Sequence, residues 1–121
     1  MNNKQKGDKG EQLVVDFLVK HGFEIIETNW RWKRCEVDII AKEQETLVFV
    51  EVKTRTNTKF GLPEESVSKH KQQQLQQAAD EFIFENNHKG EIRFDVVAVN
   101  LQQNIAIEIH HIKDAFFGFQ E

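Results

Sequence analysis

The sequence predicts a single α/β domain, with a mixed central sheet flanked by helices and the element order α-β-β-β-α-β-β. Two segments carry apolar residues at helical spacing, and five carry the patterns of strands. The second helical segment separates the third strand from the fourth, which favours a mixed sheet with helices packed on it. The 121 residues suit one domain with one core, and no internal repeat or linker divides them.

The first helix is predicted over residues 10–21, after a flexible basic segment over residues 1–8. Its apolar residues recur at helical spacing. Gly22 follows, as glycine does just past the end of a helix. The apolar residues of this helix are Leu13, Val14, Phe17 and Leu18.

Three strands are predicted next. One alternates charged and apolar residues, so that Glu36, Asp38 and Ile40 share one face. The following strand is rich in β-branched residues. A short polar turn at residues 43–45 indicates that these two strands form a hairpin. The three predicted strands span residues 23–32, 36–41 and 46–54.

The second half begins with a loop over residues 57–64, which contains the breakers Gly61 and Pro63. Ser68 is a suitable cap for a long amphipathic helix that runs to about Asn87. Two further strands are predicted over residues 92–100 and 105–110.

The net charge of −4 argues against a strongly basic, non-specific nucleic-acid binder. The charge is unevenly distributed, however: residues 1–71 carry a net +1 and residues 72–121 a net −5. This split permits a positive face on an acidic protein. Charges that only solvate the surface would give the same counts, so both interpretations stay open.

No apolar run approaches the roughly 18 residues that a membrane-spanning helix needs. The polar N-terminus does not resemble a secretory signal. Cys35 is the only cysteine, so no internal disulfide can form. We therefore expect a cytoplasmic protein without a membrane partner.

A candidate metal site lies on the predicted hairpin. Glu51 and Lys53 are two residues apart on a strand and share a face. A carboxylate among apolar residues is costly to desolvate and needs a cation. The hairpin would bring Asp38 beside Glu51, and two adjacent carboxylates repel unless a cation lies between them. Oxygen ligands of this kind suit Mg²⁺ or Mn²⁺, so Asp38 and Glu51 are the predicted metal ligands.

The chemistry of such a site would be phosphodiester hydrolysis. A divalent ion binds a phosphate oxygen and lowers the pKa of a bound water. Lys53 would orient that water or stabilise charge in the transition state. Glu11 borders the buried stripe of the first helix and is a fourth candidate catalytic residue, beside Asp38, Glu51 and Lys53. An acid-x-Lys pattern on a strand is also typical of a surface ion pair, which leaves a structural interpretation open.

Basic residues near this site are candidate nucleic-acid contacts. Trp30 and Trp32 alternate with cations, an arrangement that can stack bases and bind phosphates. Packing of both indoles on one face of a strand is an equally good interpretation. Asp95, on a later strand, is predicted to be structural and paired with Arg93 or a lysine. The candidate nucleic-acid contacts are Arg31, Lys33, Arg34, Arg55, Lys59, Lys69 and Lys71.

Five runs of the sequence form a pattern that is specific in combination. They are Gly10-Glu11, Asn29-Trp30-Arg31, Glu36-Val37-Asp38-Ile39-Ile40, Phe49-Val50-Glu51-Val52-Lys53-Thr54-Arg55 and Arg93-Phe94-Asp95-Val96. Together they closely resemble the YraN-like family of bacterial proteins, from residue 10 to about residue 99. That family is similar to the archaeal Holliday-junction resolvases of the PD-(D/E)xK nuclease superfamily.

The resemblance implies a restriction-endonuclease-like core. It places Asp38, Glu51 and Lys53 at the metal and catalytic positions of the superfamily, and Glu11 at the helical acid of the resolvases. Two residues depart from the family pattern. Cys35 stands where glycine is usual, which could alter the backbone beside Asp38, and Val14 stands where a small residue is usual.

The leading hypothesis is a Mg²⁺-dependent DNA endonuclease that acts on branched or recombination intermediates. Symmetric cutting of a junction would suit a homodimer. The alternative is a non-catalytic nucleic-acid-binding module that keeps the nuclease-like fold. A third hypothesis is an interaction protein that docks a partner through Phe116, Phe117 and Phe119.

Overall fold

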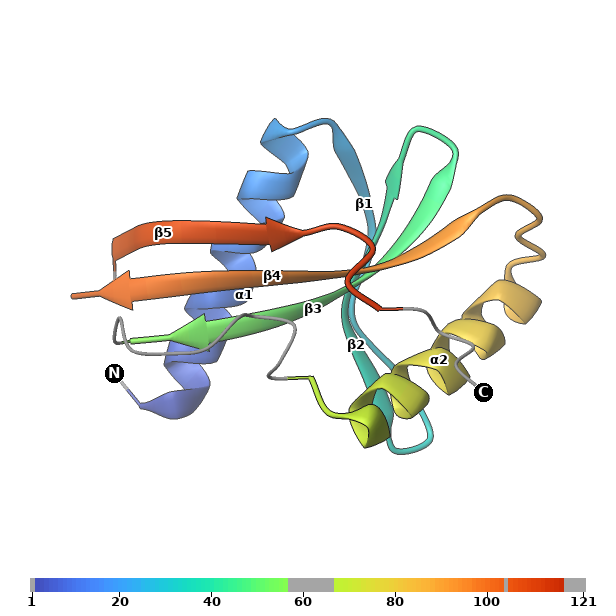
Figure 1. Cartoon of the computed structure of the whole chain (residues 1–121), viewed down its shortest axis with the longest axis horizontal. Helices are drawn as coiled ribbons and strands as arrows, with labels where there is room; N and C mark the ends of the chain where they lie inside the picture. Colours follow the sequence, from blue (N-terminus) through green and yellow to red (C-terminus); the bar gives the residue numbers. More distant parts are fainter. Residues whose placement is uncertain (1, 57–66, 104, 117–121) are drawn as a thin grey trace.

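A computed structural model describes residues 2–56, 67–103 and 105–116 of the chain (Figure 1). Within them, two helices and five strands follow one another in the predicted order. The predicted loop over residues 57–64 lies outside the described residues. The elements are α1 (Asn3–Lys20), β1 (Phe23–Trp32), β2 (Cys35–Glu43), β3 (Thr46–Arg55), α2 (Lys69–Glu85), β4 (Ile92–Gln102) and β5 (Ile105–Ile112).

The five strands form one mixed sheet, which confirms the predicted fold class. Their order in the sheet is the order in the chain, β1-β2-β3-β4-β5. β3 and β4 are parallel, whereas the other neighbouring strands are antiparallel. A parallel pair requires a crossover connection, and α2 lies in the crossover between β3 and β4.

The two helices cover opposite faces of the sheet (Figure 1). On one face Val48 of β3 packs in a cluster with Leu18 of α1. On the other face Phe49 packs in a cluster with Phe82 of α2, with ring centroids 6.1 Å apart. Successive side chains of a strand point to opposite faces, so β3 is buried on both sides and is the centre of the core.

Helix α1 begins earlier than the sequence prediction, at Asn3 and not at residue 10. The Asn2 side chain accepts a hydrogen bond from the Gln5 N–H at 2.8 Å, and the Gln5 side chain accepts one from the Asn2 N–H at 2.9 Å. This reciprocal capping box satisfies backbone donors at the start of the helix. Residues 3–8, for which the sequence predicts a flexible basic segment, therefore form the first turns of α1.

Gly10 allows α1 to lie directly against β3. It is buried, and a Cβ atom added there would lie 3.1 Å from Cβ and Cγ2 of Thr54, tighter than ordinary van der Waals contact. The missing side chain thus sets the distance between helix and sheet. Glu11 follows immediately, so the same close approach brings its carboxylate toward the end of β3.

The first residues of β2, before Ile39, do not pair with β3. The two strands pair from Glu43↔Thr46 to Ile39↔Val50, whereas the preceding part of β2 pairs with β1. Val37 lies in the cluster on the α2 side and Ile39 in the cluster on the α1 side, although strict alternation would put them on one face. The divergence from β3 allows β2 to twist between these positions, and Asp38 lies between them.

Phe116 follows β5 and stacks on Phe94 with ring centroids 5.4 Å apart. This contact places Phe116 against the core and not on a free surface. Phe117 and Phe119, the other rings of the predicted docking segment, lie outside the described residues. No described helix is long and apolar enough to cross a membrane.

Candidate functional site

Asp38 and Glu51 lie where β2 and β3 separate. They come directly next to Ile39 and Val50, the last residues that pair between the two strands. Their carboxyl groups interact, since the charge of Asp38 raises the pKa of Glu51. Asp38 Oδ2 also accepts a hydrogen bond of 2.8 Å from the Val52 N–H. The predicted hairpin is therefore confirmed, and it brings the two predicted metal ligands together.

Glu51 is a buried carboxylate between two lysines. It is 5% exposed, and its Oε2 lies 3.5 Å from Lys53 Nζ. Its Oε1 lies 3.9 Å from Lys71 Nζ, too far for a hydrogen bond, and has no hydrogen-bond partner within the described part of the chain. The site thus contains two acids and two cations, with one buried oxygen left unsatisfied.

Burial and mutual repulsion raise the pKa values of both acids. Burial has the largest effect on Glu51, the charge of Asp38 adds to it, and Lys71 and Lys53 oppose it only in part, so the pKa is about 7. Burial also raises the pKa of Asp38, against the Val52 N–H and Lys71, which lower it. At neutral pH the folded protein therefore favours a proton or another cation at this pair.

Glu11 reaches this region from α1. Its Oε1 accepts a hydrogen bond of 2.9 Å from Asn29 Nδ2 of β1. Burial raises the pKa of Glu11 and Asn29 lowers it, while Asp38 and Glu36 add repulsion. Asn29 has a positive φ of 51°, a conformation that asparagine adopts more readily than most residues. The sequence prediction missed Asn29 as the partner of Glu11.

Lys71 was predicted as a phosphate contact, and the structure places it beside Glu51. It lies in the first turn of α2, where its N–H donates to the capping Ser68 hydroxyl at 3.1 Å. That turn has no acidic residue, and Lys71 lowers the pKa of Glu51. In the sequence, the sign that Lys71 has a negatively charged partner was its position at the start of a helix, where a positive charge is unfavourable.

The other basic candidates surround this site without entering it. The Arg31 side chain is 71% exposed and lies 3.5 Å from Glu36. Arg55 is half-buried at the end of β3. Lys59 lies outside the described residues. The remaining candidates are exposed, in the β1–β2 turn and at the start of α2; they are Lys33, Arg34 and Lys69.

A pocket of about 320 Å³ lies beside Glu11, between the start of α1 and the end of β3. Val52 lines it, and the N–H of Val52 is the group that binds Asp38. Its other lining residues are small or polar: Asn3, Lys6, Gly7, Thr54 and Thr56. The pocket is thus adjacent to the carboxylate pair and offers a cation and two hydroxyl groups.

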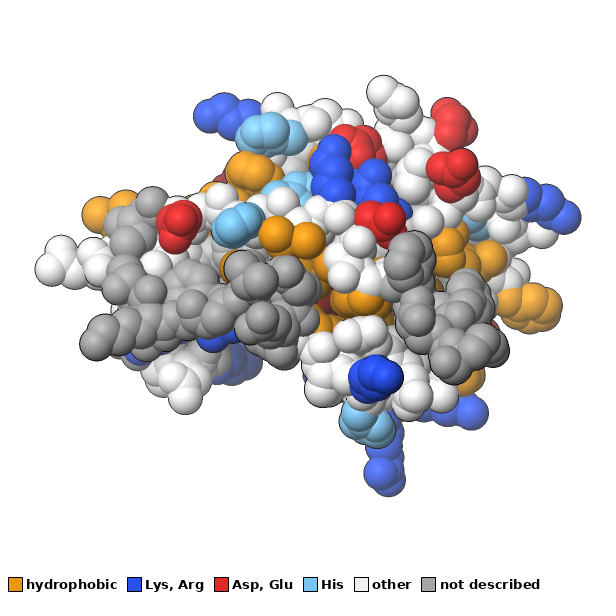
Figure 2. All heavy atoms as spheres, in the orientation of Figure 1, with side chains coloured by type: hydrophobic (Ala, Val, Ile, Leu, Met, Phe, Trp, Pro, Cys, Tyr) orange, Lys and Arg blue, Asp and Glu red, His pale blue; other side chains and the backbone are white. Residues whose placement is uncertain are grey.

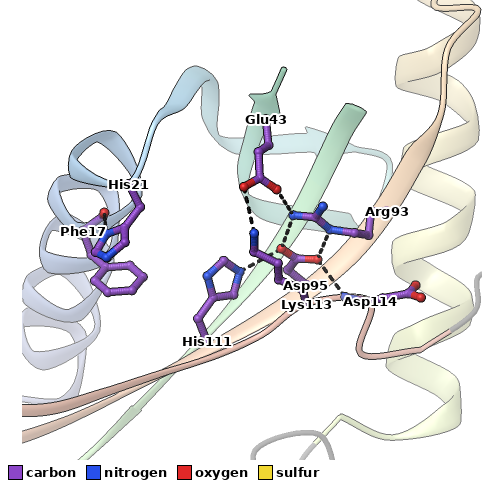
Figure 3. A network of polar contacts seen from close by, with 8 residues as sticks. All are labelled: Phe17, His21, Glu43, Arg93, Asp95, His111, Lys113 and Asp114. Atoms are coloured by element: carbon purple, nitrogen blue, oxygen red, sulfur yellow. Dashed lines mark hydrogen bonds and ion pairs between the residues drawn. The ribbon is translucent and has the colours of Figure 1, made fainter. Parts of the chain in front are cut away.

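A second polar cluster surrounds Asp95 of β4 (Figure 3). Asp95 is fully buried there; Arg93 donates to both of its oxygens at 2.8 and 2.9 Å, as the sequence predicts. His111 Nε2 lies 2.8 Å from Asp95 Oδ2, and the Asp114 N–H donates at 3.0 Å. Glu43 of β2 binds Arg93 at 2.8 Å. The cluster joins β2, β4 and β5, and all its charges are paired internally.

The hydrogen-bond partners of Asp95 lower its pKa by more than burial raises it. Burial alone would raise the pKa of this carboxyl, but His111, Arg93 and the Asp114 N–H together hold it below its usual range. A fully satisfied carboxylate of this kind stabilises the fold. We therefore assign Asp95 a structural role, as the sequence predicts.

The carboxylate pair fits a divalent cation that keeps several waters. Among the described residues no group of three or more His, Cys, Asp or Glu side chains could hold a metal ion. Mg²⁺ often binds through only one or two carboxylates and retains water ligands. The unsatisfied Glu51 Oε1 and the raised pKa of Glu51 both favour a further positive charge at this pair. Lys53 and Lys71 supply part of that positive charge.

Comparison with known proteins identifies relatives across nearly the whole chain. A family model described as "Uncharacterised protein family UPF0102" matches residues 10–99. A UPF0102 protein of Caldicellulosiruptor bescii is 52% identical over 119 residues, covering 96% of this chain and 100% of the relative. One from Clostridioides difficile is 47% identical over 117 residues, again covering 96% of this chain and 100% of the relative.

Among solved structures, the chain is similar to "The structure of Pyrococcus Furiosus SfsA in complex with Ca2+". The TM-score is 0.40 and the sequence identity 11%. The match covers 93% of this chain and 64% of that chain, so this protein spans less than two thirds of it. A likeness at this level is too weak to assign a function.

Proposed function

The chain belongs to the uncharacterised protein family UPF0102, the YraN-like family that its sequence resembles, and we propose that it is a divalent-metal-dependent DNA endonuclease. The observation that carries the proposal is the pair Asp38 and Glu51, whose carboxyl groups interact at the point where β2 and β3 separate. Glu51 is buried with an unsatisfied oxygen and a pKa of about 7, beside Lys53 and Lys71. Acids whose pKa values are strongly perturbed by burial and by charged neighbours are typical of functional sites.

Each residue has a chemical role in this proposal. A divalent ion held by Asp38 and Glu51 would lower the pKa of a water and neutralise charge on the phosphodiester. Lys53 would stabilise the charge that develops at phosphorus, because it is fixed near the pair before the reaction begins. Glu11, whose pKa is raised by burial, would accept a proton from the attacking water.

The shape of the site supports a nucleic-acid substrate. The pocket beside Glu11 offers Lys6 and the hydroxyl-bearing Thr54 and Thr56, which are suitable phosphate contacts. Branched or recombination DNA is proposed from the family resemblance to junction resolvases. Symmetric cutting of such a junction would use two copies of this chain.

A cleavage assay tests the proposal. Branched, single-stranded and duplex DNAs would each be incubated with excess protein in Mg²⁺, in Mn²⁺ and in EDTA. We expect metal-dependent cutting, strongest on branched DNA, and none in EDTA. Glu51→Gln should abolish cutting, while Glu45→Gln, in the exposed β2–β3 turn, should leave it unchanged.

The assay also distinguishes the alternative function. If folded wild type binds DNA but cuts none of the forms in either metal, the endonuclease proposal is wrong. The protein would then be a nucleic-acid-binding module in which Lys53 and Lys71 serve only to neutralise Glu51.

A further inference from the structure

A second pocket lies at the end of the β1–β2 hairpin, against the start of α2. Its volume is about 350 Å³, within the range of small-ligand sites. The hairpin contributes an indole, two cations and a thiol; the helix contributes a histidine and three amides. The lining residues are Trp32, Lys33, Arg34, Cys35, His70, Gln73, Gln74 and Gln77.

The two tryptophans of β1 have different environments. Trp30 packs against the core cluster on the α2 side, with its ring 5.3 Å from Phe82 in an edge-on contact. Trp32 instead lines the pocket, and Lys33 Nζ lies 4.6 Å from its ring centroid. Core packing therefore explains Trp30, while Trp32 presents an aromatic ring and a cation to a ligand.

The groups around Trp32 match the chemistry of a nucleobase. Every base can stack on an indole ring, and a neighbouring cation adds to the attraction. Glutamine amides offer both donors and acceptors, which base edges require. Gln73, Gln74 and Gln77 bring three such amides to the same pocket.

The surface around the pocket is positive. Among the described residues, Figure 2 shows lysine, arginine and histidine side chains, and no acidic ones, along the lower edge of the visible face. In Figure 1 the start of α2 and the β1–β2 turn lie at that edge. Lys33, Arg34, Lys69 and His70 are exposed residues of those two segments. A phosphate backbone would therefore be attracted there even though the whole chain is acidic.

The pocket is connected to the carboxylate pair through two elements. In α2, His70 lines the pocket, and the adjacent Lys71 reaches Glu51. In β2, Cys35 lines the pocket, and Asp38 follows three residues later, about 10 Å along the strand.

We propose that this pocket binds one unpaired base of a nucleic-acid strand whose backbone continues toward Asp38 and Glu51. The proposal deepens the endonuclease proposal, because it makes DNA with an unpaired segment the preferred substrate. A fully paired duplex hides its base faces and cannot fill the pocket without opening a base pair.

Fluorescence titration without metal tests the pocket separately from cleavage. The chain has two tryptophans, so Trp30→Phe leaves Trp32 as the single reporter. In EDTA, a short oligo(dT) strand should quench Trp32. A strand of equal length with abasic residues should quench it little and bind more weakly, and a blunt duplex should do the same. An oligo(U) strand distinguishes RNA from DNA as the preferred source of the base.

Substitutions test which residues of the pocket bind the base. Trp32→Ala should weaken oligo(dT) binding about 5- to 150-fold, the range for loss of one stacked base. Phe84→Ala, which removes an aromatic ring that is 82% exposed near the other end of α2, should leave binding unchanged. A melt confirms that Trp32→Ala is folded. If it is not, the exposed pair Gln73→Ala and Gln77→Ala should weaken binding to oligo(dT) but not to the abasic strand.

Equal binding of abasic and oligo(dT) strands, or unchanged Trp32 fluorescence at saturation, would overturn the proposal. Cleavage of DNA without base-dependent binding would refute the pocket and leave the endonuclease proposal standing. Base-dependent binding without cleavage would refute the endonuclease proposal and leave the pocket proposal standing.

Discussion

The carboxylate of Asp38 accepts a hydrogen bond of 2.8 Å from the backbone N–H of Val52, the residue that follows Glu51. The contact ties β2 to β3 just where their regular pairing ends. The Asp38 carboxylate is therefore held against β3 before any ligand arrives. A site held in this way loses little energy to reorganisation when a cation or substrate binds.

Mn²⁺ should bind wild type but not Asp38→Asn, since the ion needs both carboxylates. Binding should strengthen from about pH 6 to about pH 8, because the ion binds ionised Glu51, whose pKa is about 7. Isothermal calorimetry at several pH values measures this, and Asp16→Asn, an exposed position on α1, is the matched control. Equal binding by wild type and Asp38→Asn would contradict the metal site.

Glu51→Gln should become more stable relative to wild type as pH rises, in the absence of metal. The folded-state pKa of Glu51 is raised from 4.5 to about 7, so ionisation between these values destabilises the folded wild type. The difference in free energy of unfolding should change by about 3 kcal/mol at most between about pH 4.5 and about pH 8. Urea denaturation in EDTA measures it, with the exposed Glu45→Gln as control. A change of opposite sign would mean that the lysines stabilise the charged form.

Lys53→Ala should reduce cleavage by about 100-fold or more, the scale for one electrostatic stabiliser. DNA affinity should fall far less, because Lys53 acts mainly in the transition state. Lys71 remains beside Glu51, so the fold should survive, and a thermal melt checks this. Lys20→Ala, exposed at the end of α1, controls for loss of positive charge. Equal losses of affinity and cleavage would assign Lys53 to substrate binding alone.

Asp95→Asn should lower the free energy of unfolding by about 3 kcal/mol, since it leaves Arg93 with an incomplete set of buried partners. The pKa of Asp95 is held below its usual range, so this stabilisation is present above its unfolded pKa and is lost as pH falls through the lower folded pKa. The difference in free energy of unfolding between Asp95→Asn and wild type should therefore become smaller at acid pH. Urea denaturation at several pH values measures it. The exposed Asp114→Asn should show no comparable loss, and Mn²⁺ binding should be unaffected by either change.

Gly10→Ala should destabilise the protein by about 1–3 kcal/mol, because the added methyl group collides with Thr54. Gly7→Ala is the matched control in the same helix: nothing lies within 4 Å of its added Cβ, so it should stabilise by up to about 1 kcal/mol. The double change Gly10→Ala with Thr54→Ala should recover part of the loss. Thermal melts of wild type, Gly10→Ala, Thr54→Ala and the double variant form a double-mutant cycle. If the effects of the two single changes on the free energy of unfolding simply add up in the double variant, the contact is ruled out.

The sequence predicted those features that depend on local patterns. Apolar spacing and β-branched residues located the strands, and the short turn between β2 and β3 brought Asp38 and Glu51 together. The start of α1 was missed because its first turns carry no apolar stripe, although Asn2 and Gln5 have the spacing of a capping box. Lys71 beside Glu51 was missed because tertiary packing of α2 on the sheet creates that contact.

The partner of Glu11 and the pocket at Trp32 were missed for the same reason as Lys71, because both depend on tertiary packing. The hydrogen bond from Asn29 joins residues 18 apart, and it forms only when α1 docks on the sheet. The glutamines of α2 meet Trp32 only when that helix packs against the β1–β2 hairpin. No periodicity within either segment indicates such a contact.

The strand order also has a consequence for folding. The two acids belong to one hairpin, so a short stretch of chain is enough to bring them together, whereas Lys71 arrives with a helix that must cross over the sheet. Local pairings generally form before those that close long loops. Asp38 and Glu51 would thus become neighbours in the hairpin first, and the docking of α2 would then bring Lys71 to Glu51.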